Sequence, residues 1–503
     1  MSPTTPSYLI FITAAAILHY VLPTRFRNLF LLIASLVFYM WAVPQYGIFV
    51  VFTSGLCYFS GLWIEKLQGR KKKAVLTVTL LVLLGILFVF KYYNFFMQII
   101  SDAFALFGTE ITAAKFSLAV PIGISFYTFQ VIGYLVDVSN GKIAAERNII
   151  DFALFVTFFP AILSGPIGRA GELLPQYKAE RNFDYDGIRT GLQRFLTGAF
   201  RKVVLADGIA IIIDPVIESA SSYGSLTVIA AVLLYNIKIY CDFAGYSEMA
   251  VGAARIFGIG VRENFNVPFF ASDMAGFWKR WHMSLTTWLQ DYVFTPLVWS
   301  RWANKVCFGK KWEEHKPVIL VNILIVFLVS GIWHGAAYGY IIWGLLHGLF
   351  RIAEELAGKY RKKRKIKKKK TKTAVALGRV RVFLLAAFAH MFFTLKAGSL
   401  IPAMFREYSV RGTVGEILFL ASNEIASSGI YMLLYFGILA AGFLLMFIAD
   451  REIFRTGDLN PVSRLKTAPR WAVYWFMGLS VCWFYVIAAT GAAGAASFIY
   501  FGF

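Results

Sequence analysis

Apolar stretches long enough to cross a lipid bilayer recur along almost the whole sequence. A membrane-crossing helix needs about 20 predominantly apolar residues, whereas a membrane β-strand shows as a short segment of alternating polarity, a pattern that this sequence lacks. The sequence therefore predicts an all-α, polytopic integral membrane protein with about 11–13 membrane helices, re-entrant or interfacial ones included. The expected helices lie near residues 7–22, 28–43, 46–64, 74–97, 117–136, 149–165, 190–213, 225–241, 318–333, 335–350, 374–395, 430–449 and 471–490.

Positive charge is concentrated in short loops between these stretches. The formal net charge is +22, and two basic runs stand out, at residues 70–73 and 361–370. Lys and Arg in short loops mark the cytoplasmic side, and such runs attract anionic lipids. We therefore expect a multi-pass protein of the inner or plasma membrane whose N-terminus and C-terminal tail are extracytoplasmic. Nucleic acid is not expected as a partner, because the basic loops lack stacking aromatic residues and known binding motifs.

No internal repeat and no long soluble segment divides the sequence. We expect one transmembrane domain over residues 1–503, made of N-terminal helices (1–116), a core with histidine motifs (117–400) and C-terminal helices with an aromatic tail (401–503). The four cysteines are widely spaced and predict neither a disulfide framework nor a metal site. The first apolar stretch lacks a preceding basic segment, so we expect a retained helix rather than a cleaved signal. Any active site must then lie within the membrane or at its surfaces.

One histidine interrupts the most apolar part of the sequence. His334 stands between Val318 and Leu346, in a stretch without Asp, Glu, Lys or Arg. An ionisable side chain at membrane depth is costly, which makes it a functional candidate. The alternative is a helix-packing histidine that is bonded to a backbone carbonyl. Further along, His347 follows Trp343 by about one helical turn and is expected to be a structural residue at a helix end.

A second histidine lies in an aromatic segment over residues 277–292. If this segment forms one helix, a single face carries the apolar and aromatic side chains, while Lys279 and Arg280 point away from it. Such a helix is typical of the headgroup level of a membrane, where indole rings are favoured. The alternative is that the helix serves only as an anchor. The residues expected on the shared face are Trp278, Trp281, His282, Leu285, Trp288, Leu289 and Tyr292.

These two histidine segments together resemble the membrane-bound O-acyltransferase family, in particular its alginate O-acetylation branch. The resemblance rests on residues 280–292 and on residues 333–348, in this order and with their histidines roughly 50 residues apart. Supporting segments are residues 120–126, 159–166 and 240–247. The resemblance implies that His334 is catalytic and that His282 assists it. The residues that it implies as substrate contacts are Trp278, Arg280, Trp281, Asp291 and Trp333.

The sequence departs from the family pattern at two places. His390 and Thr394 stand where a Trp and an Arg are expected, and Gln290 replaces an Arg that is common in the first histidine segment. These differences bear on the fine specificity rather than on the class of protein.

The chain ends in an aromatic hexapeptide, residues 498–503, after a run of Gly and Ala. One interpretation is an aromatic belt at the membrane interface. The hexapeptide also resembles a C-terminal tyrosine motif of extracytoplasmic members of the family and of small partner proteins. That resemblance implies that Tyr500 carries the acyl group as an ester and that the Gly/Ala run lets the tail fold back toward His334.

The resemblance implies a membrane O-acetyltransferase without a bound cofactor. Acetyl-CoA would be the acyl donor, and the acetyl group would reach an envelope polysaccharide through a secreted or membrane-anchored extracytoplasmic acetyltransferase. Two alternatives stay open: D-alanyl transfer to teichoic acid by the same chemistry, and a transporter or flippase for a polysaccharide precursor. The absence of an inverted repeat and of paired acidic residues disfavours the transporter.

Overall fold

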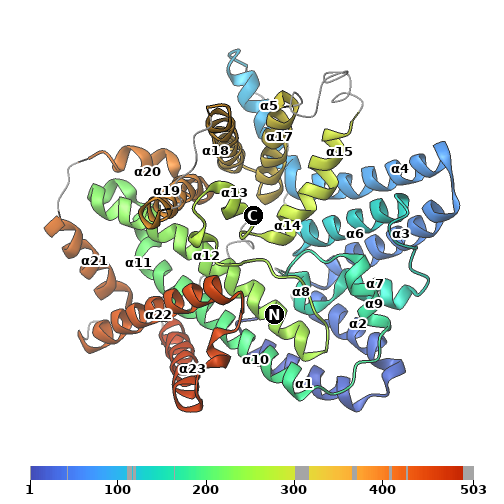
Figure 1. Ribbon diagram of the computed structural model, residues 1–503, viewed down its shortest axis with the longest axis horizontal. Helices are drawn as coiled ribbons and strands as arrows, with labels where there is room; N and C mark the ends of the chain where they lie inside the picture. The colour runs from blue at the N-terminus through green and yellow to red at the C-terminus, as the bar shows by residue number, and fades with distance from the viewer. Residues whose placement is uncertain are drawn as a thin grey trace. The chain divides into compact units, whose positions relative to one another are not determined.

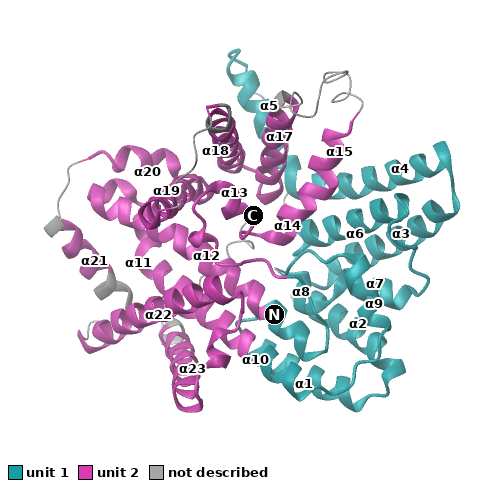
Figure 2. Cartoon of the chain, in the orientation of Figure 1, with its two compact units in different colours: residues 1–192, 250–262 teal, residues 193–249, 263–503 magenta. Residues whose placement is uncertain are grey.

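The computed structural model describes residues 2–41, 43–109, 116, 120–163, 165–300, 316–364, 371–406, 410–425 and 429–490. Within these ranges the chain folds into helices and contains no strand (Figure 1). It forms two compact units (Figure 2). Unit 1 comprises residues 1–192 and 250–262, and unit 2 comprises residues 193–249 and 263–503.

Unit 1 is built mainly from the N-terminal helices. Helices α4 and α5 are joined by a π-helical turn, η2 (Phe88–Tyr92), so that helical structure is continuous over Gly69–Ala105. The helix expected over residues 74–97 is longer in the structure, because helix continues to Ala105. The helices are α1 (Pro6–Val21), α2 (Thr24–Met40), α3 (Gly47–Lys66), α4 (Gly69–Leu87), α5 (Tyr93–Ala105), α6 (Ile124–Ser139), α7 (Ile149–Thr157), α8 (Phe159–Ile162), α9 (Ala170–Lys178) and the start of α10 (Tyr185–Ala199).

Two buried arginines close helix ends in unit 1. Arg27 donates to the carbonyls of Tyr20 and Leu22 at the end of α1, at 3.3 and 3.1 Å. Arg181 donates to the carbonyls of Gln176 and Tyr177 in α9, at 2.7 and 3.0 Å. The last carbonyls of a helix lack partners within it, so these charged donors satisfy groups that would otherwise be buried without hydrogen bonds.

Unit 2 contains the longer C-terminal helices and both histidine segments. α10 continues through a π-helical segment, η3 (Phe200–Ala206), into the next helix without a break. The remaining helices are α11 (Asp207–Glu218), α12 (Ser225–Ile256, which ends in unit 1), α13 (Met274–Trp278), α14 (Met283–Leu289), α15 (Thr295–Val298), α17 (Lys316–His334), α18 (Tyr338–Lys363), α19 (Lys372–His390), α20 (Ala397–Ala403), α21 (Val410–Ile425), α22 (Gly429–Thr456) and α23 (Thr467–Thr490).

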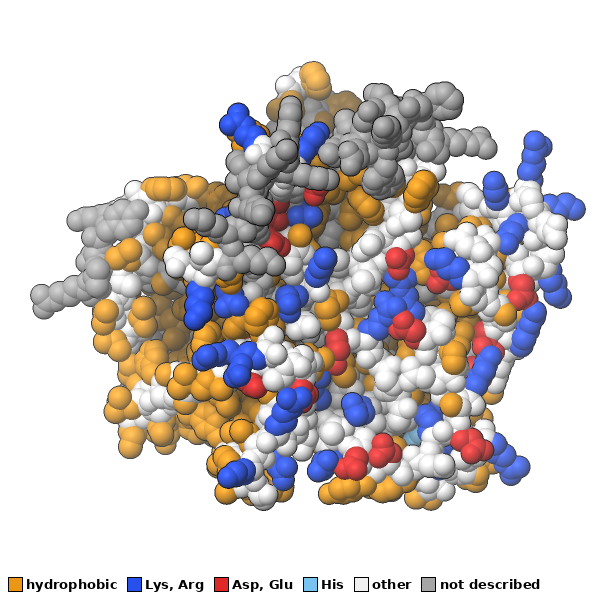
Figure 3. All heavy atoms as spheres, viewed as in Figure 1, with side chains coloured by type: hydrophobic (Ala, Val, Ile, Leu, Met, Phe, Trp, Pro, Cys, Tyr) orange, Lys and Arg blue, Asp and Glu red, His pale blue; other side chains and the backbone are white. Residues whose placement is uncertain are grey.

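Several helices are long and apolar enough to cross a membrane. In the part of the chain that the structure describes, three shorter apolar helical stretches accompany them, at Pro6–Val21, Ile149–Ile162 and Val318–His334. Large apolar side chains are exposed along α22, and Figure 3 shows hydrophobic side chains gathered over the region of α22 and α23. The protein is therefore an all-α, multi-pass membrane protein, as predicted. Among the described residues, the six long apolar spans cover Pro44–Lys66, Gly69–Ala105, Ser225–Ile256, Lys372–Thr394, Gly429–Thr456 and Thr467–Ile487.

The π-helical segment η3 carries two buried cations that are paired across unit 2. Arg201 lies 2.6 Å from Asp450 of α22. Lys202 lies 2.7 Å from Asp242 of α12 and 2.6 Å from Asp207. Removing either partner would leave a buried charge uncompensated, which is strongly destabilising. Asp242 belongs to one of the segments that carry the family resemblance, and its ion pair gives it a structural role.

Candidate active site

Helices α17 and α18 form a tight antiparallel hairpin that places His334. A Cβ atom added to Gly331 would lie 2.3 Å from the Tyr340 carbonyl oxygen, and one added to Gly344 would lie 2.4 Å from that of Phe327. Only glycine fits at these two positions, because the obstructing atoms are backbone. The hairpin thereby sets His334, the last residue of α17, against Trp343 of α18.

His334 is enclosed by aromatic rings. It is 2% exposed. Its ring centroid lies 4.9 Å from that of Trp343, 5.1 Å from Trp333 and 5.2 Å from Phe393, each in an edge-to-face arrangement. This enclosure keeps bulk water away from the imidazole, and it leaves a limited number of directions from which a substrate can approach.

The sequence predicted one amphipathic helix for the aromatic segment that carries His282, and this prediction is wrong. α13 ends at Trp278, and α14 begins at Met283. Between them His282 adopts the left-handed conformation, with φ 42° and ψ 52°, which a continuous right-handed helix excludes. The aromatic side chains are also buried rather than arranged along one exposed interface, since Trp278 is 7% and Trp281 2% exposed. The regular spacing of the apolar and aromatic residues in this segment therefore marks buried side chains on both sides of a turn, not one face of a helix.

A buried amide fixes the orientation of the His282 ring. The Asn264 Oδ1 atom accepts hydrogen bonds from the Ser284 hydroxyl at 2.6 Å and from the Ser284 backbone N–H at 3.3 Å. A backbone N–H can only donate, so this contact identifies the amide oxygen. The same oxygen lies 3.3 Å from His282 Nδ1, which must therefore carry the proton. The Asn264 amide nitrogen donates to the Ser247 hydroxyl at 3.0 Å.

This arrangement leaves His282 Nε2 as an acceptor. His282 is 1% exposed, and its Nε2 atom has no hydrogen-bond partner among the described residues. His282 lies outside the membrane-spanning helices, and burial lowers its pKa to about 3. The imidazole is therefore neutral at physiological pH, with its lone pair on Nε2. A neutral imidazole of this tautomer can accept a hydrogen bond or a proton, but Nε2 cannot donate to a carbonyl.

The two histidines predicted from the sequence meet in space. Their ring centroids are 6.2 Å apart, although roughly 50 residues separate them along the chain. Trp333 contacts both rings, at 5.7 Å from His282 and 5.1 Å from His334. Two buried imidazoles at this separation can both contact one small reacting group that lies between them. General acid–base chemistry requires such contact, because the base must reach the proton that it takes.

The predicted substrate contacts divide into two groups. Trp278 lies 5.8 Å from Trp343, and Trp333 touches both histidines, so these indoles belong to the same cluster. Trp281 joins it through His390, at 5.0 Å. Arg280 instead donates to the Asn266 carbonyl at 3.2 Å and lies over the Phe454 ring, and Asp291 is exposed in the π-helical segment η6 (Gln290–Phe294).

Two further buried histidines belong to this cluster. His347 lies well inside α18 rather than at a helix end, and it is fully buried 4.8 Å from Trp343. His390 lies 5.9 Å from His347, and its Nδ1 atom lies 2.7 Å from Asn236 Oδ1. The sequence had drawn attention to His390, because it stands where the family pattern has a Trp. The partner Asn236 carried no sequence signal, because it sits on α12, far from any motif.

One predicted site residue cannot be placed with the others. Tyr500 lies outside the described residues. Among the described residues no group of three or more His, Cys, Asp or Glu side chains could hold a metal ion.

Comparison with known proteins identifies the family of this chain. The model of the MBOAT, membrane-bound O-acyltransferase family matches residues 33–395, a range that includes both meeting histidines. The chain belongs to the membrane-bound O-acyltransferase family. The matched range ends just beyond Phe393, so all the rings that enclose His334 lie within it.

Similar proteins within this family carry three kinds of name. The chain is 37% identical over 340 residues to "Probable alginate O-acetylase AlgI" of Azotobacter vinelandii, covering 67% of this chain and 65% of that protein. It is 32% identical over 351 residues to the "Peptidoglycan O-acetyltransferase" of Helicobacter pylori, covering 64% and 63%. It is 33% identical over 250 residues to the "Teichoic acid D-alanyltransferase" of Bacillus subtilis, covering 48% and 61%. The chain thus spans a little under two thirds of the length of these relatives.

Proposed function

We propose that this protein is a membrane O-acyltransferase that moves an acetyl group from acetyl-CoA toward a cell-envelope polysaccharide. The observation that carries the proposal is the meeting of His282 and His334 in a buried aromatic enclosure, 6.2 Å apart. Family membership supports acyl transfer over the transporter alternative. The names of the relatives support polysaccharide, peptidoglycan or teichoic acid acceptors as the class.

In this proposal His334 is the general base. Its imidazole takes the proton of the acceptor hydroxyl as the oxygen attacks the thioester carbonyl. The new C–O bond forms, the C–S bond breaks, and the proton on His334 passes to the leaving thiolate, so that the thiol is released. An imidazole can both accept and release a proton, so this one side chain can carry out both proton transfers.

His282 would position the donor rather than polarise it. Its neutral tautomer presents a lone pair on Nε2, which suits an N–H donor such as the amide next to the thioester. Asn264 keeps this tautomer in place through its contact with Nδ1. Trp278, Trp281 and Trp333 would enclose the reacting group and exclude water.

The first acceptor would be Tyr500, and the final acceptor a polysaccharide reached through an extracytoplasmic acetyltransferase. A phenol with a pKa of about 10 leaves far more readily than a sugar alkoxide, so an aryl ester keeps enough transfer potential for a second step. We further propose an inner or plasma membrane location in which the N-terminus and the C-terminal tail are extracytoplasmic. The basic runs support this orientation.

The decisive experiment follows radiolabelled acetyl-CoA through the purified protein, with His334→Ala and Tyr500→Phe beside the wild type. Label on Tyr500 that depends on His334 is the expected result. Hydrolysis that depends on His334 without a tyrosine adduct would move the first acceptor to a partner protein. D-alanyl transfer without acetyl transfer would favour the teichoic acid alternative. Activity unchanged in His334→Ala would refute the assignment of the base.

A further inference from the structure

Two arginines of unit 2 meet at the ring of Phe454, near the end of α22. The Cζ atoms of Arg280 and Arg379 each lie 5.1 Å from the centroid of this ring. The two cations are therefore separated by at most twice that distance. Arg280 belongs to the turn before His282 and Arg379 to α19, so segments that are far apart in the sequence bring these charges together.

Neither arginine forms an ion pair with a carboxylate among the described residues. Arg280 donates to the Asn266 carbonyl at 3.2 Å, and Arg379 donates to the Phe270 carbonyl at 3.1 Å. Both side chains are half-buried. A partly buried charge is costly unless an opposite charge accompanies it, and contacts with aromatic rings offset only part of that cost. The pair therefore favours an anion beside Phe454.

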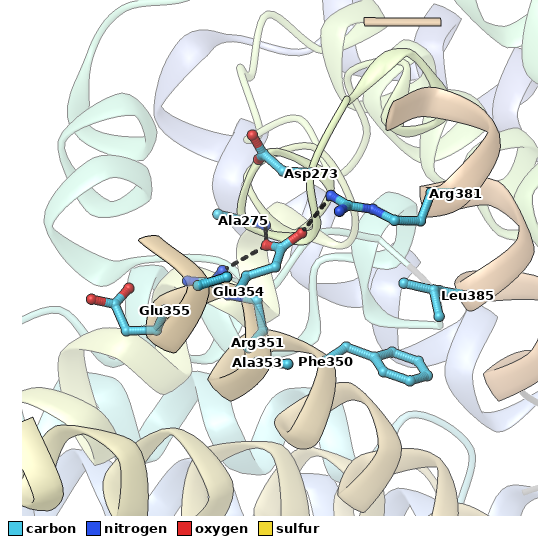
Figure 4. Close-up of a pocket in the computed structure, with 10 residues that line it drawn as sticks. Asp273, Ala275, Phe350, Arg351, Ala353, Glu354, Glu355, Arg381 and Leu385 are labelled. Atoms are coloured by element: carbon cyan, nitrogen blue, oxygen red, sulfur yellow. Dashed lines mark hydrogen bonds and ion pairs between the residues drawn. The ribbon is translucent and has the colours of Figure 1, made fainter. Parts of the chain in front are cut away.

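The next arginine of α19 differs in this respect. Arg381 lines a cavity of about 570 Å³ and lies 3.2 Å from the carboxylate of Glu354, which also pairs with Arg351 at 3.0 Å (Figure 4). Residues two apart on a helix do not face the same neighbours. The charge of Arg381 is thus compensated within the protein, whereas that of Arg379 is not.

An apolar stripe of α22 leads to the arginine pair. Exposed apolar side chains recur on one face of this helix, while Gly442 and Ile453 of the opposite face are buried. Over the length of the stripe the helix rises ~15 Å, about the hydrocarbon thickness of one membrane leaflet. In Figure 3 Lys and Arg side chains border the hydrophobic patch over this region. The stripe comprises Leu444, Phe447, Ile448 and Phe454.

Aromatic rings join the stripe to the arginines. Phe270 is stacked against Phe447 and Phe454, with 5.9 and 5.4 Å between the ring centroids. The Cζ atom of Arg379 lies 5.1 Å from the Phe270 ring. Arg451 is exposed about one turn from both rings of α22 and adds a further cation. Aromatic rings are favoured at the headgroup level of a membrane, and basic side chains there attract anionic lipids.

We propose that the end of α22 binds an anionic phospholipid of the cytoplasmic leaflet. Its phosphate would lie at Arg280 and Arg379, and an acyl chain would follow the stripe from Phe454 to Leu444. The site is separate from the basic runs at residues 70–73 and 361–370. The inference takes the membrane orientation from the proposed function, but it does not depend on acyl transfer.

This lipid site adjoins the turn that carries His282. The Asn266 N–H donates to the Arg280 carbonyl at 2.9 Å, and the Met283 N–H donates to the Asn264 carbonyl at 2.8 Å. These two backbone hydrogen bonds hold the turn together. A phosphate at Arg280 contacts one end of it, so the bound lipid should stabilise the folded protein as any ligand of the native state does.

The test measures lipid binding to the full-length protein, delipidated in detergent, by native mass spectrometry. Phosphatidylglycerol is compared with phosphatidylcholine, which carries no net charge. Each basic side chain near a membrane surface contributes about a fivefold preference for an anionic lipid, so the pair should give about a twentyfold preference. Arg280→Gln and Arg379→Gln should each reduce this preference about fivefold. Arg381→Gln is the matched control and should leave it unchanged, because Glu354 already compensates that charge.

Thermal unfolding is the second readout. Phosphatidylglycerol should raise the unfolding midpoint of the wild type more than that of Arg379→Gln, a variant that leaves Arg280 and its turn intact if Arg280→Gln does not fold. Equal affinity of the wild type for the two lipids, or an unchanged preference in the Arg379→Gln variant, would overturn the inference. Displacement of the lipid by soluble acetyl-CoA would also overturn it, because the arginines would then serve the donor. His334-dependent transfer is measured separately, so its loss would overturn the proposed function and leave this inference standing.

Discussion

Asn264 offers the sharpest test of how the candidate site is held together. Its side-chain oxygen faces His282 Nδ1 at 3.3 Å and accepts from the Ser284 hydroxyl and backbone N–H. Asn264→Leu keeps the volume but orphans at least two buried donors, the His282 Nδ1–H and the Ser284 backbone N–H. Each orphaned donor costs about 1–3 kcal/mol, so we expect a loss of roughly 2–6 kcal/mol in the free energy of unfolding.

The assay is denaturant unfolding in detergent, followed by tryptophan fluorescence. Asn266→Leu is the matched control, because Asn266 lies on the same segment and, among the described residues, its side-chain oxygen accepts a single contact, from Arg280 at 3.4 Å. We expect that control to lose less than about 1 kcal/mol. Equal losses in the two variants, or a loss below about 0.5 kcal/mol for Asn264→Leu, would refute the claim that this amide orients the His282 ring.

Three further variants test the surrounding structure. Burial lowers the pKa of His282 to about 3, below its unfolded value of 6.5, so the stability that the neutral imidazole contributes is complete above pH 6.5 and is lost as the pH falls toward 3. Between pH 7 and pH 5 the free energy of unfolding of the wild type should fall by about 2 kcal/mol more than that of His282→Asn, measured in parallel unfolding curves. Asparagine is the replacement because it tolerates the left-handed conformation. Gly344→Ala should cost about 1–3 kcal/mol because its Cβ meets backbone, whereas Gly358→Ala in open space of the same helix should be neutral or stabilising by calorimetry. Arg201→Met should lower stability by about 3–5 kcal/mol, and adding Asp450→Leu should restore part of it in a double-mutant cycle.

The helices could be predicted from the sequence because membrane length and hydropathy decide them. Helical structure overlaps each expected apolar stretch, for example α1 (Pro6–Val21) with 7–22 and α17 (Lys316–His334) with 318–333. The expected stretch 149–165 is divided between α7 and α8, and α21 (Val410–Ile425) had not been expected. The short helices around His282 could not be predicted in this way. There, the apolar spacing is compatible with one helix along the whole segment, whereas in the structure His282 takes a left-handed conformation and contacts Asn264. Periodicity reports which side chains are buried, but not whether the backbone between them turns.

The functional residues were visible in the sequence to the extent that their chemistry is unusual for a membrane. His334 stood out because an imidazole in an apolar stretch is costly. The polar residues that contact the neighbouring histidines were less visible in the sequence. Asn264 contacts His282 and Asn236 contacts His390, but neither asparagine lies in an unusual sequence pattern. Trp343 shows the same point from the apolar side. It is fully buried and contacts both His334 and His347, and its place in the histidine segment 333–348 did not reveal these contacts. A site of this kind is therefore recognised by which side chains share one aromatic enclosure, and that follows from the crossing of α17 and α18 at Gly331 and Gly344 rather than from a motif.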